Sequence, residues 1–356
     1  NLANGLYMSK YIDFIQSQLD YNIGGEEALL NILTDNMDLL QQITGEQISY
    51  FVNLLNKMSF KSARHLEFLS TICSCYTKAV AANQDAIVKL LVNPASNVLS
   101  LLPIPYLDGE NVFVKLGDLQ PVEIVQFCAN PLLIPTPMNE GLLEFFTQMI
   151  SLFGKLCMNR NESALNLIRG ILSESLIFHC IKNEKLSHKL RRSFCNLLLH
   201  AYINIAPKTK IDFISVTRKW HELENQDQQI ESAEFSELKR FMISYFNKNT
   251  SIDINNVEKN KFILTLVRMC KIMFDFNIFK GNECNSAINA VNNILMQSSL
   301  GKLASEQKNI DTKTRYAETE QNLIVMKIKL EICKIIEISM DIRANRRLTK
   351  FLNFYK

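Results

Sequence analysis

Residues 184–200 read EKLSHKLRRSFCNLLLH, and this stretch decides between a chemical site and a scaffold. Its apolar side chains recur at the spacing of one helix face, and Ser187 is placed to cap the helix. We therefore predict an amphipathic helix that buries Phe194 and Leu198 against the helix before it. The apolar stripe is Leu190, Phe194, Leu197, Leu198 and Ala201, and the basic residues off the stripe are Lys189, Arg191 and Arg192.

The cysteines and histidines near this stretch lack the spacing of a reactive site. Cys195 and His200 are five positions apart, so on a helix they point about 140° away from each other. A nucleophile and its base must be within hydrogen-bond reach, and the adjacent His179 and Cys180 diverge in the same way. Elsewhere, Cys73 and Cys75 are separated by one residue rather than the two typical of a zinc knuckle. We expect packing roles for all of them, with no catalytic or metal-binding residue and no enzyme.

Outward from this helix, the same periodicity covers most of the chain. Residues 175–182 end another helix and 183–185 form a short turn, so the unit is helix–turn–helix. Short amphipathic helices that cannot bury their apolar faces alone predict an all-α armadillo/HEAT-like α-solenoid of helix pairs. The further predicted helices are 7–19, 26–33, 44–58 (with Thr44 as its cap), 63–80, 83–92, 141–158, 162–172, 211–222, 235–247, 259–274, 285–296 and 322–340.

A proline-rich stretch interrupts the pattern at 98–137. Within it, Asn-Val-Phe-Val-Lys-Leu-Gly-Asp (111–118) predicts a short β-hairpin strand, and we expect the whole insertion to project from the solenoid. The polar segments 224–234 and 298–321 are predicted linkers. The expected domains are 1–97, the first armadillo helices; 98–137, the insertion; 138–223, helical repeats; 224–234, a linker; 235–297, further repeats; 298–321, a polar linker; and 322–356, a C-terminal helix.

Composition and charge exclude several classes of protein. The chain has 356 residues, 47% of them hydrophobic and 21% charged, which is typical of a globular fold rather than disorder. A net charge of +3 gives no general attraction to nucleic acid. Nine cysteines, an odd number mostly within apolar runs, indicate reduced thiols in a cytosolic chain. No apolar run reaches the roughly 18–20 residues that cross a bilayer. Because the sequence starts at Asn1, we expect it to be part of a longer protein.

The charged clusters have ordinary explanations. Glu26 and Glu27 suit a helix N-terminus, and the Gly24-Gly25 pair before them does not form a phosphate-binding loop. The basic runs 189–192 and 343–350 are interpreted as solvated faces that pair with nearby carboxylates, with binding of an anion or acidic partner as the alternative. Trp220 is predicted to anchor a helix in the core.

Nine segments together resemble the superfamily of inositol trisphosphate and ryanodine receptors, in the family's order and over nearly the whole chain. The likeness is greater to the inositol trisphosphate receptor branch, although 73–84 (CSCYTKAVAANQ) is also similar to the ryanodine receptors. The segments are YMSKYIDFIQSQLDYNI (7–23), DLLQQITGEQISYFVNLL (38–55), FLSTICSC (68–75), LLVNPAS (90–96), LFGKLCMNRNESALNLI (152–168), LRRSFCNLLLH (190–200), VTRKWHEL (216–223), VEKNKFILTLVRMC (257–270) and FDFNIF (274–279).

The resemblance implies a cytosolic solenoid segment of a tetrameric calcium-release channel of the endoplasmic reticulum, which couples ligand binding to a distant pore. It also implies that the repeats at 138–223 are RIH-like. It implies no cofactor in this segment, calcium regulation of the parent channel, and partners among the channel's own domains and subunits. Nucleic acid is not an implied partner, and the membrane would be reached through other parts of the protein. Where the receptors carry a Tyr-Arg-Lys cluster that contacts the inositol phosphate, this chain has Asn1, Leu2 and Ala3. A free-standing armadillo/HEAT adaptor, which binds a peptide or helix in its concave groove, remains the alternative.

Overall fold

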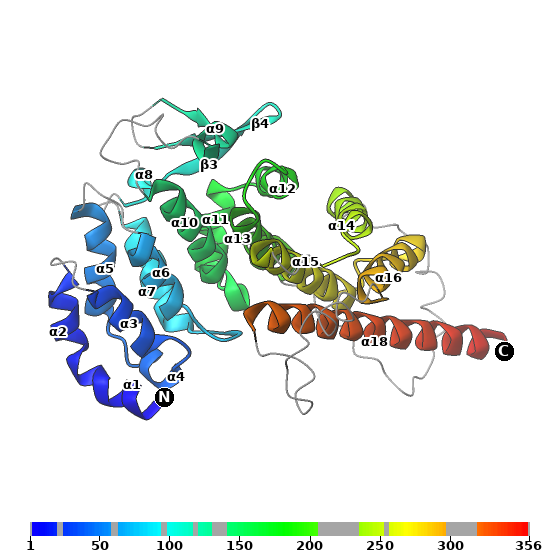
Figure 1. The fold of residues 1–356 in the computed structure, drawn as a ribbon, viewed down its shortest axis with the longest axis horizontal. Coiled ribbons are helices and arrows are strands. Elements are labelled where there is room, and N and C mark those ends of the chain that lie inside the picture. The colour runs from blue at the N-terminus through cyan, green and yellow to red at the C-terminus, as the bar shows by residue number, and fades with distance from the viewer. Residues whose placement is uncertain are drawn as a thin grey trace, which may run out of the picture. The chain divides into compact units, whose positions relative to one another are not determined.

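The computed structural model describes residues 2–19, 24–57, 63–93, 98–116, 120–129, 141–205, 235–252, 256–296 and 319–354. The chain divides into two compact units, residues 1–205 and 206–356, which are described separately below. Helices dominate both units and the sheets are small, which confirms the predicted fold class (Figure 1). The expected helix 211–222, Trp220 and most of the two expected linkers lie outside the described residues.

The first unit begins with short helices. A single helix over 7–19 was predicted, and this prediction is wrong: the 3-10 turn η1 (Ser9–Tyr11) separates α1 (Leu2–Met8) from α2 (Ile12–Ser17). The backbone of Tyr11 leaves the helical region there, with φ −105° and ψ 7°. The next helices are α3 (Gly25–Leu33), α4 (Met37–Leu40), α5 (Gly45–Lys57), α6 (Ala63–Ile72) and α7 (Ala81–Val92).

Helix α5 starts at the predicted Thr44 cap. The Thr44 hydroxyl accepts a hydrogen bond from the Gln47 N–H at 3.2 Å, and the Gln47 side chain accepts one from the Thr44 N–H at 3.1 Å. This reciprocal pair is a capping box, which satisfies two of the N–H groups left open at a helix start.

The helix predicted over 63–80 is wrong in its second half. Helix α6 ends at Ile72, and a small hairpin follows, formed by β1 (Ser74–Cys75) and β2 (Lys78–Ala79). At the hairpin turn Tyr76 has a positive φ of 51°, and its N–H donates to the Asp35 carboxylate at 2.9 Å. The chain turns here because a side chain 41 residues away holds it, which local periodicity does not reveal.

The insertion contains the predicted hairpin, extended to three strands. After α8 (Val98–Leu101), β3 (Ile104–Asp108) pairs with β4 (Asn111–Lys115) and β4 with β5 (Val122–Glu123), both antiparallel. Helix α9 (Ile124–Ala129) follows. The insertion lies at one edge of the helices of this unit (Figure 1), where Phe127 of α9 packs edge-on against Phe146 of the solenoid, with ring centroids 5.4 Å apart.

Stacked helix pairs form the rest of the unit. Helix α10 (Leu142–Leu156) lies between α6 and α13 (His188–Leu198), and α7 lies between α5 and α11 (Glu162–Ile171), so the helices form two layers (Figure 1). Side chains of Asn161, Ser173 and Ser187 accept N–H bonds at the starts of α11, α12 and α13. The remaining elements are η4 (Met158–Arg160), α12 (Glu174–Lys182) and the π-helical turn η5 (Leu199–Ile203).

Three consecutive side chains of α7 bond to neighbouring helices. The buried Asn83 amide donates to the carbonyls of Leu40 and Ile72, the last residues of α4 and α6. The buried Gln84 amide donates to Lys155 O at 2.8 Å and Met158 O at 3.2 Å, at the end of α10. Asp85 accepts from the Asn161 side chain at 2.7 Å. Carbonyls at a helix end have no partner within the helix, so these side chains satisfy them across the layers.

Gly154 sets the approach of α10 to α13. A Cβ atom at this position would lie 3.2 Å from the backbone nitrogen of Leu197, whereas one at Gly170 in α11 would meet no heavy atom within 4 Å. Alanine in a helix is favoured over glycine by about 1 kcal/mol. We expect Gly170→Ala to raise the free energy of unfolding by up to about 1 kcal/mol and Gly154→Ala to lower it by about 1–2 kcal/mol. Urea denaturation of both variants checks the opposite signs, and equal stabilisation would contradict a close contact at Gly154.

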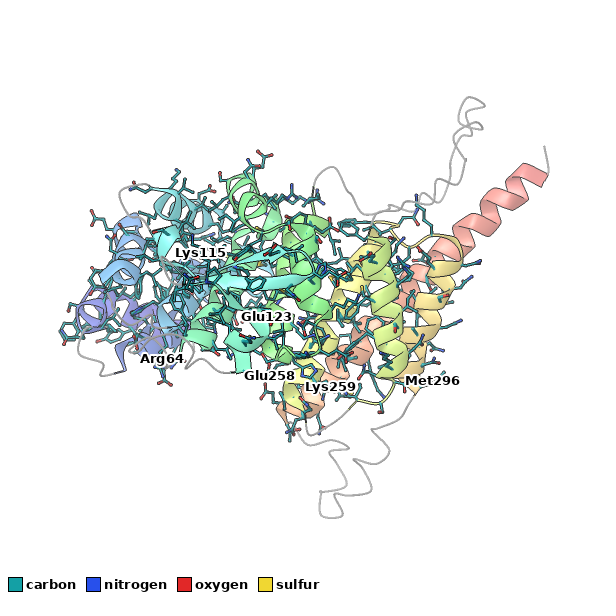
Figure 2. All side chains as sticks on the ribbon, turned by 90° about the horizontal axis from the view of Figure 1, so that it is seen from above. Arg64, Lys115, Glu123, Glu258, Lys259 and Met296 are labelled. Atoms are coloured by element: carbon teal, nitrogen blue, oxygen red, sulfur yellow. The ribbon has the colours of Figure 1, made fainter. Side chains whose placement is uncertain are left out.

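The second unit contains α14 (Ser236–Lys248), α15 (Val257–Asp275), α16 (Gly281–Met296) and α18 (Glu320–Phe354). Helix α15 contacts α18, and α14 and α18 each contact α16. Glu258 and Lys259 mark the start of α15, and Met296 the exposed end of α16 (Figure 2). The buried Lys239 of α14 forms an ion pair with Glu283 of α16 at 2.6 Å.

Candidate functional site

The stretch that opened the sequence lies in the core. Helix α13 begins after Ser187, as predicted, and Phe194 and Leu198 are both buried, with α13 packed against α12. Burial raises the pKa of the Cys195 thiol well above its usual range, so the thiol is protonated at neutral pH. His200 lies in the π-helical turn, and burial lowers its pKa to about 4. A neutral buried thiol and a neutral, partly buried imidazole suit packing better than nucleophilic chemistry.

The lowered pKa of His200 predicts a pH-dependent stability. The unfolded histidine, with a pKa of about 6.5, takes up a proton before the folded one does as the pH falls. The neutral state therefore contributes stability that is full above pH 6.5 and is lost between 6.5 and about 4. We expect His200→Phe to remove about 2 kcal/mol of the stability difference between pH 7.5 and pH 4.5. Denaturation of both proteins at each pH checks this, and parallel pH dependences would contradict it.

The basic run 189–192 is split between surface and interior. Lys189 forms an ion pair with Glu144 of α10 at 2.6 Å, as expected for a solvated face. For Arg191 that expectation is wrong: its side chain is 2% exposed, and its Nε donates to the Ile181 carbonyl at 2.8 Å. Ile181 is in the last turn of α12, where open carbonyls and the helix dipole attract a cation. The guanidinium therefore closes the end of the preceding helix.

The other predicted positions also have structural surroundings. Glu26 lies in the first turn of α3, as predicted, with a carboxylate oxygen 3.3 Å from Nε2 of the buried His65. Cys73 is buried with its pKa raised to about 12 by burial, and Cys75 is buried in β1. Within the described parts of the chain, no three His, Cys, Asp or Glu residues come together to hold a metal ion. The side chains of Asn1, Leu2 and Ala3 and those of 343–350 lie outside the described residues.

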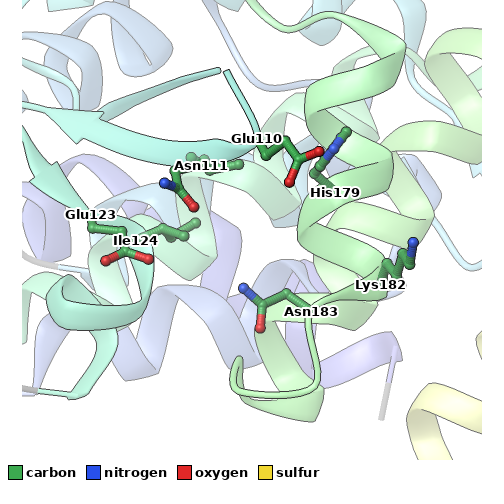
Figure 3. Close-up of a pocket in the computed structure, with 8 residues that line it drawn as sticks. Glu110, Asn111, Glu123, Ile124, His179, Lys182 and Asn183 are labelled. Carbon is green, nitrogen blue, oxygen red and sulfur yellow. The ribbon is translucent and has the colours of Figure 1, made fainter. Parts of the chain in front are cut away.

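One cleft was not predicted, because it depends on the docking of the insertion. It lies between the sheet and α12 and has a volume of about 400 Å³. Glu110 comes from the β3–β4 turn, Asn111 from the start of β4, Glu123 from β5, and His179 and Lys182 from α12 (Figure 3). The His179 Nδ1 lies 2.7 Å from the Ser175 carbonyl oxygen. Because a carbonyl oxygen can only accept, Nδ1 is the donor of this hydrogen bond. The cleft is lined by carboxylates, amides, a histidine and a lysine, which are groups that can form hydrogen bonds with a polar surface.

The described part of the chain holds no single helix that is both long and apolar enough to span a membrane. Helices α11 and α12 satisfy the length and composition criteria together, as a pair bent by 71°.

Comparison with known proteins gives matches to the same receptor superfamily that the sequence resembles. The profile of the RIH domain family matches residues 1–100. This match covers the part expected to hold the first armadillo helices, and the RIH-like repeats were expected further along the chain, at 138–223. The chain is 23% identical over 261 residues, 71% of its length, to the inositol 1,4,5-trisphosphate receptor-like protein A of Dictyostelium discoideum. It is 19% identical over 413 aligned residues, 99% of its length, to the inositol 1,4,5-trisphosphate receptor itr-1 of Caenorhabditis elegans. The chain spans 8% and 14% of these relatives. The matches confirm the resemblance to the receptor superfamily and its inositol trisphosphate receptor branch.

Proposed function

We propose that this relative of the inositol trisphosphate receptors is a solenoid segment of an intracellular ligand-gated calcium-release channel, which couples ligand binding to a distant pore. The observation that carries the proposal is the similarity to a named receptor over 99% of the chain. The parent protein would be a homotetramer in the endoplasmic reticulum membrane, with this segment on the cytosolic side. Its partners would be other domains and subunits of that channel, and calcium would regulate the whole.

The packing of the first unit supports a coupling role. Helices α6, α10 and α13 lie side by side, and hydrogen bonds through Gln84 and Lys189 cross from one pair to the next. Arg191 joins the two helices of one pair, α12 and α13. A solenoid whose repeats contact their neighbours transmits a small rotation along the stack, because each interface is a packed core that does not deform continuously. A displacement at the N-terminal helices would then reach distant parts of the protein as a rigid-body movement.

The test uses the full-length parent protein, reconstituted in vesicles loaded with a calcium dye. We expect inositol trisphosphate to release calcium, and Gln84→Ala to reduce that release at least about threefold while ligand affinity changes by less than about twofold. The matched control is Gln148→Ala, because the Gln148 amide bonds within its own helix, to Glu144 at 3.0 Å. A full-length protein that conducts no calcium in response to any inositol phosphate would overturn the proposal in favour of the adaptor alternative.

The ligand itself is expected to need other parts of the protein. Three clustered phosphates are strongly hydrated, and they give up water only for several fixed cations. Asn1, Leu2 and Ala3 supply none, so residues 1–356 alone should show no measurable affinity for inositol trisphosphate. Calorimetry at low ionic strength is the most permissive measurement, because electrostatic attraction is then least screened. Micromolar binding would contradict this placement of the N-terminus and direct attention to the basic run 343–350.

A further inference from the structure

Helix α18 carries two apolar stripes on opposite faces. The first consists of Val325, Ile328, Ile332 and Ile335, all at 0% exposure, in a helix that packs against α15 and α16. The second is exposed: Leu323 at 54%, Met326 at 48%, Leu330 at 55% and Met340 at 62%. Residues two apart on a helix differ by about 200°, so Leu323, Met326 and Leu330 point directly away from Val325, Ile328 and Ile332.

The exposed stripe has the spacing of a coiled-coil seam. Positions 323, 326, 330, 333, 337 and 340 alternate in steps of three and four, which is the a/d pattern of the heptad. Leu323, Met326, Leu330 and Met340 fill four of these six seam positions, and the exposed Cys333 and Glu337 fill the other two. The seam runs along about 26 Å of helix, at 1.5 Å per residue. So narrow a stripe, interrupted by Glu337, suits another helix better than a lipid surface, which binds a wide apolar face.

The charges beside the seam indicate which helix fits. Lys327, Lys329 and Lys334 occupy three of the six flanking e and g positions, the places that select a coiled-coil partner, and the other three hold Asn322, Ile336 and Asp341. Lys334 bonds to Glu331 at 3.1 Å, whereas Lys327 and Lys329 make no ion pair with any residue that the structure describes. A second helix with acidic flanks would face these lysines.

A second copy of the same helix is disfavoured in both orientations. In a parallel pair, Lys329 of each helix would face Lys334 of the other, and the two Glu337 side chains would meet on the seam. In an antiparallel pair centred between Leu330 and Cys333, Lys327 would face Lys334. Like charges at these positions oppose association.

We propose that the exposed face of α18 from Leu323 to Met340 is a docking surface for an amphipathic helix of another protein segment, with apolar a/d residues and acidic flanks. The proposal rests on the second unit alone and is independent of a role in a calcium channel. Glu337 sets the register, because the partner must place a cation or polar group opposite it.

The experiment uses residues 1–356 and two synthetic three-heptad peptides, one with glutamate and one with lysine at e and g. Both carry leucine at a and d, except for one asparagine at the position that faces Glu337. Fluorescence anisotropy should show at least about tenfold tighter binding of the glutamate peptide. Reversing Lys327, Lys329 and Lys334 to glutamate together should invert the preference. Leu330→Glu should abolish binding, while Met296→Glu, at a more exposed apolar site at the end of α16, should leave it unchanged.

Cys333 gives a second readout of the same surface. Of the nine cysteines, all of which the structure describes, it is the exposed one. The glutamate peptide should slow maleimide labelling of Cys333 about tenfold or more, in step with its occupancy of the seam. Equal binding of both peptides, or labelling that neither peptide slows, would overturn the proposal. Self-association in sedimentation that Leu330→Glu abolishes would instead assign the face to a second copy of the chain. Binding to anionic vesicles that Leu330→Glu abolishes would assign it to a membrane. Either result would also overturn the proposal.

Discussion

Replacing Phe194 with alanine is expected to lower the free energy of unfolding by about 3–5 kcal/mol. The side chain is 0% exposed and lies in the centre of α13, where its ring contacts Phe146 of α10 edge-on with centroids 6.3 Å apart. Truncation removes the ring's contacts with two neighbouring helices and leaves a cavity, because α10 and α13 are held at close distance by Gly154 and cannot collapse into the space. Urea denaturation followed by circular dichroism measures the loss.

Phe14→Ala is the matched control for this change. Phe14 lies in α2 of the same unit and is 65% exposed, so the same truncation should alter the free energy of unfolding by no more than about 0.5 kcal/mol. A loss of less than about 1 kcal/mol for Phe194→Ala would mean that α13 presents a different face to α10.

Arg191→Ala should be similarly damaging, at about 3–5 kcal/mol. The substitution removes a fully buried large side chain and leaves the Ile181 carbonyl without its 2.8 Å hydrogen bond at the end of α12. A buried polar group that loses its partner costs about 1–3 kcal/mol, to which the cavity adds. The measurement is again the free energy of unfolding in urea.

Arg192→Ala, the same change one residue along, provides the comparison. Arg192 is half-buried at the edge of the helix, and its truncation should cost no more than about 1 kcal/mol. If both variants lost the same free energy of unfolding, the burial of the Arg191 guanidinium and its bond to Ile181 would make no contribution to stability.

Local signals were enough to predict most of the helices. The period of Leu190, Phe194 and Leu197 with the Ser187 cap placed α13, and Thr44 placed the start of α5. These predictions succeeded because caps and apolar spacing act within a few residues of the chain. The alternation of 111–115 identified β4 for the same reason.

Features that depend on distant residues could not be predicted in this way. The hairpin after α6 is held by Asp35, and the insertion docks through Phe127 onto Phe146. The cleft beside α12 exists because of that docking, so no local pattern marked Glu110 or Glu123. Arg191 was placed at the surface because it lies off the apolar stripe, and the Ile181 carbonyl that accepts its hydrogen bond is ten residues away in the chain.

The side-chain amides of α7 bond to the ends of α4, α6 and α10, so the local unfolding of one of these helix ends also breaks hydrogen bonds to α7. The Ile72 carbonyl at the end of α6 accepts a hydrogen bond from Asn83, and the Lys155 carbonyl at the end of α10 accepts one from Gln84. Fraying at these ends therefore requires α7 to leave as well, and the free energy of that larger opening governs the exchange of the end amides with solvent. Adjacent repeats of the first unit consequently open together as one cooperative block, although each has its own hydrophobic contacts.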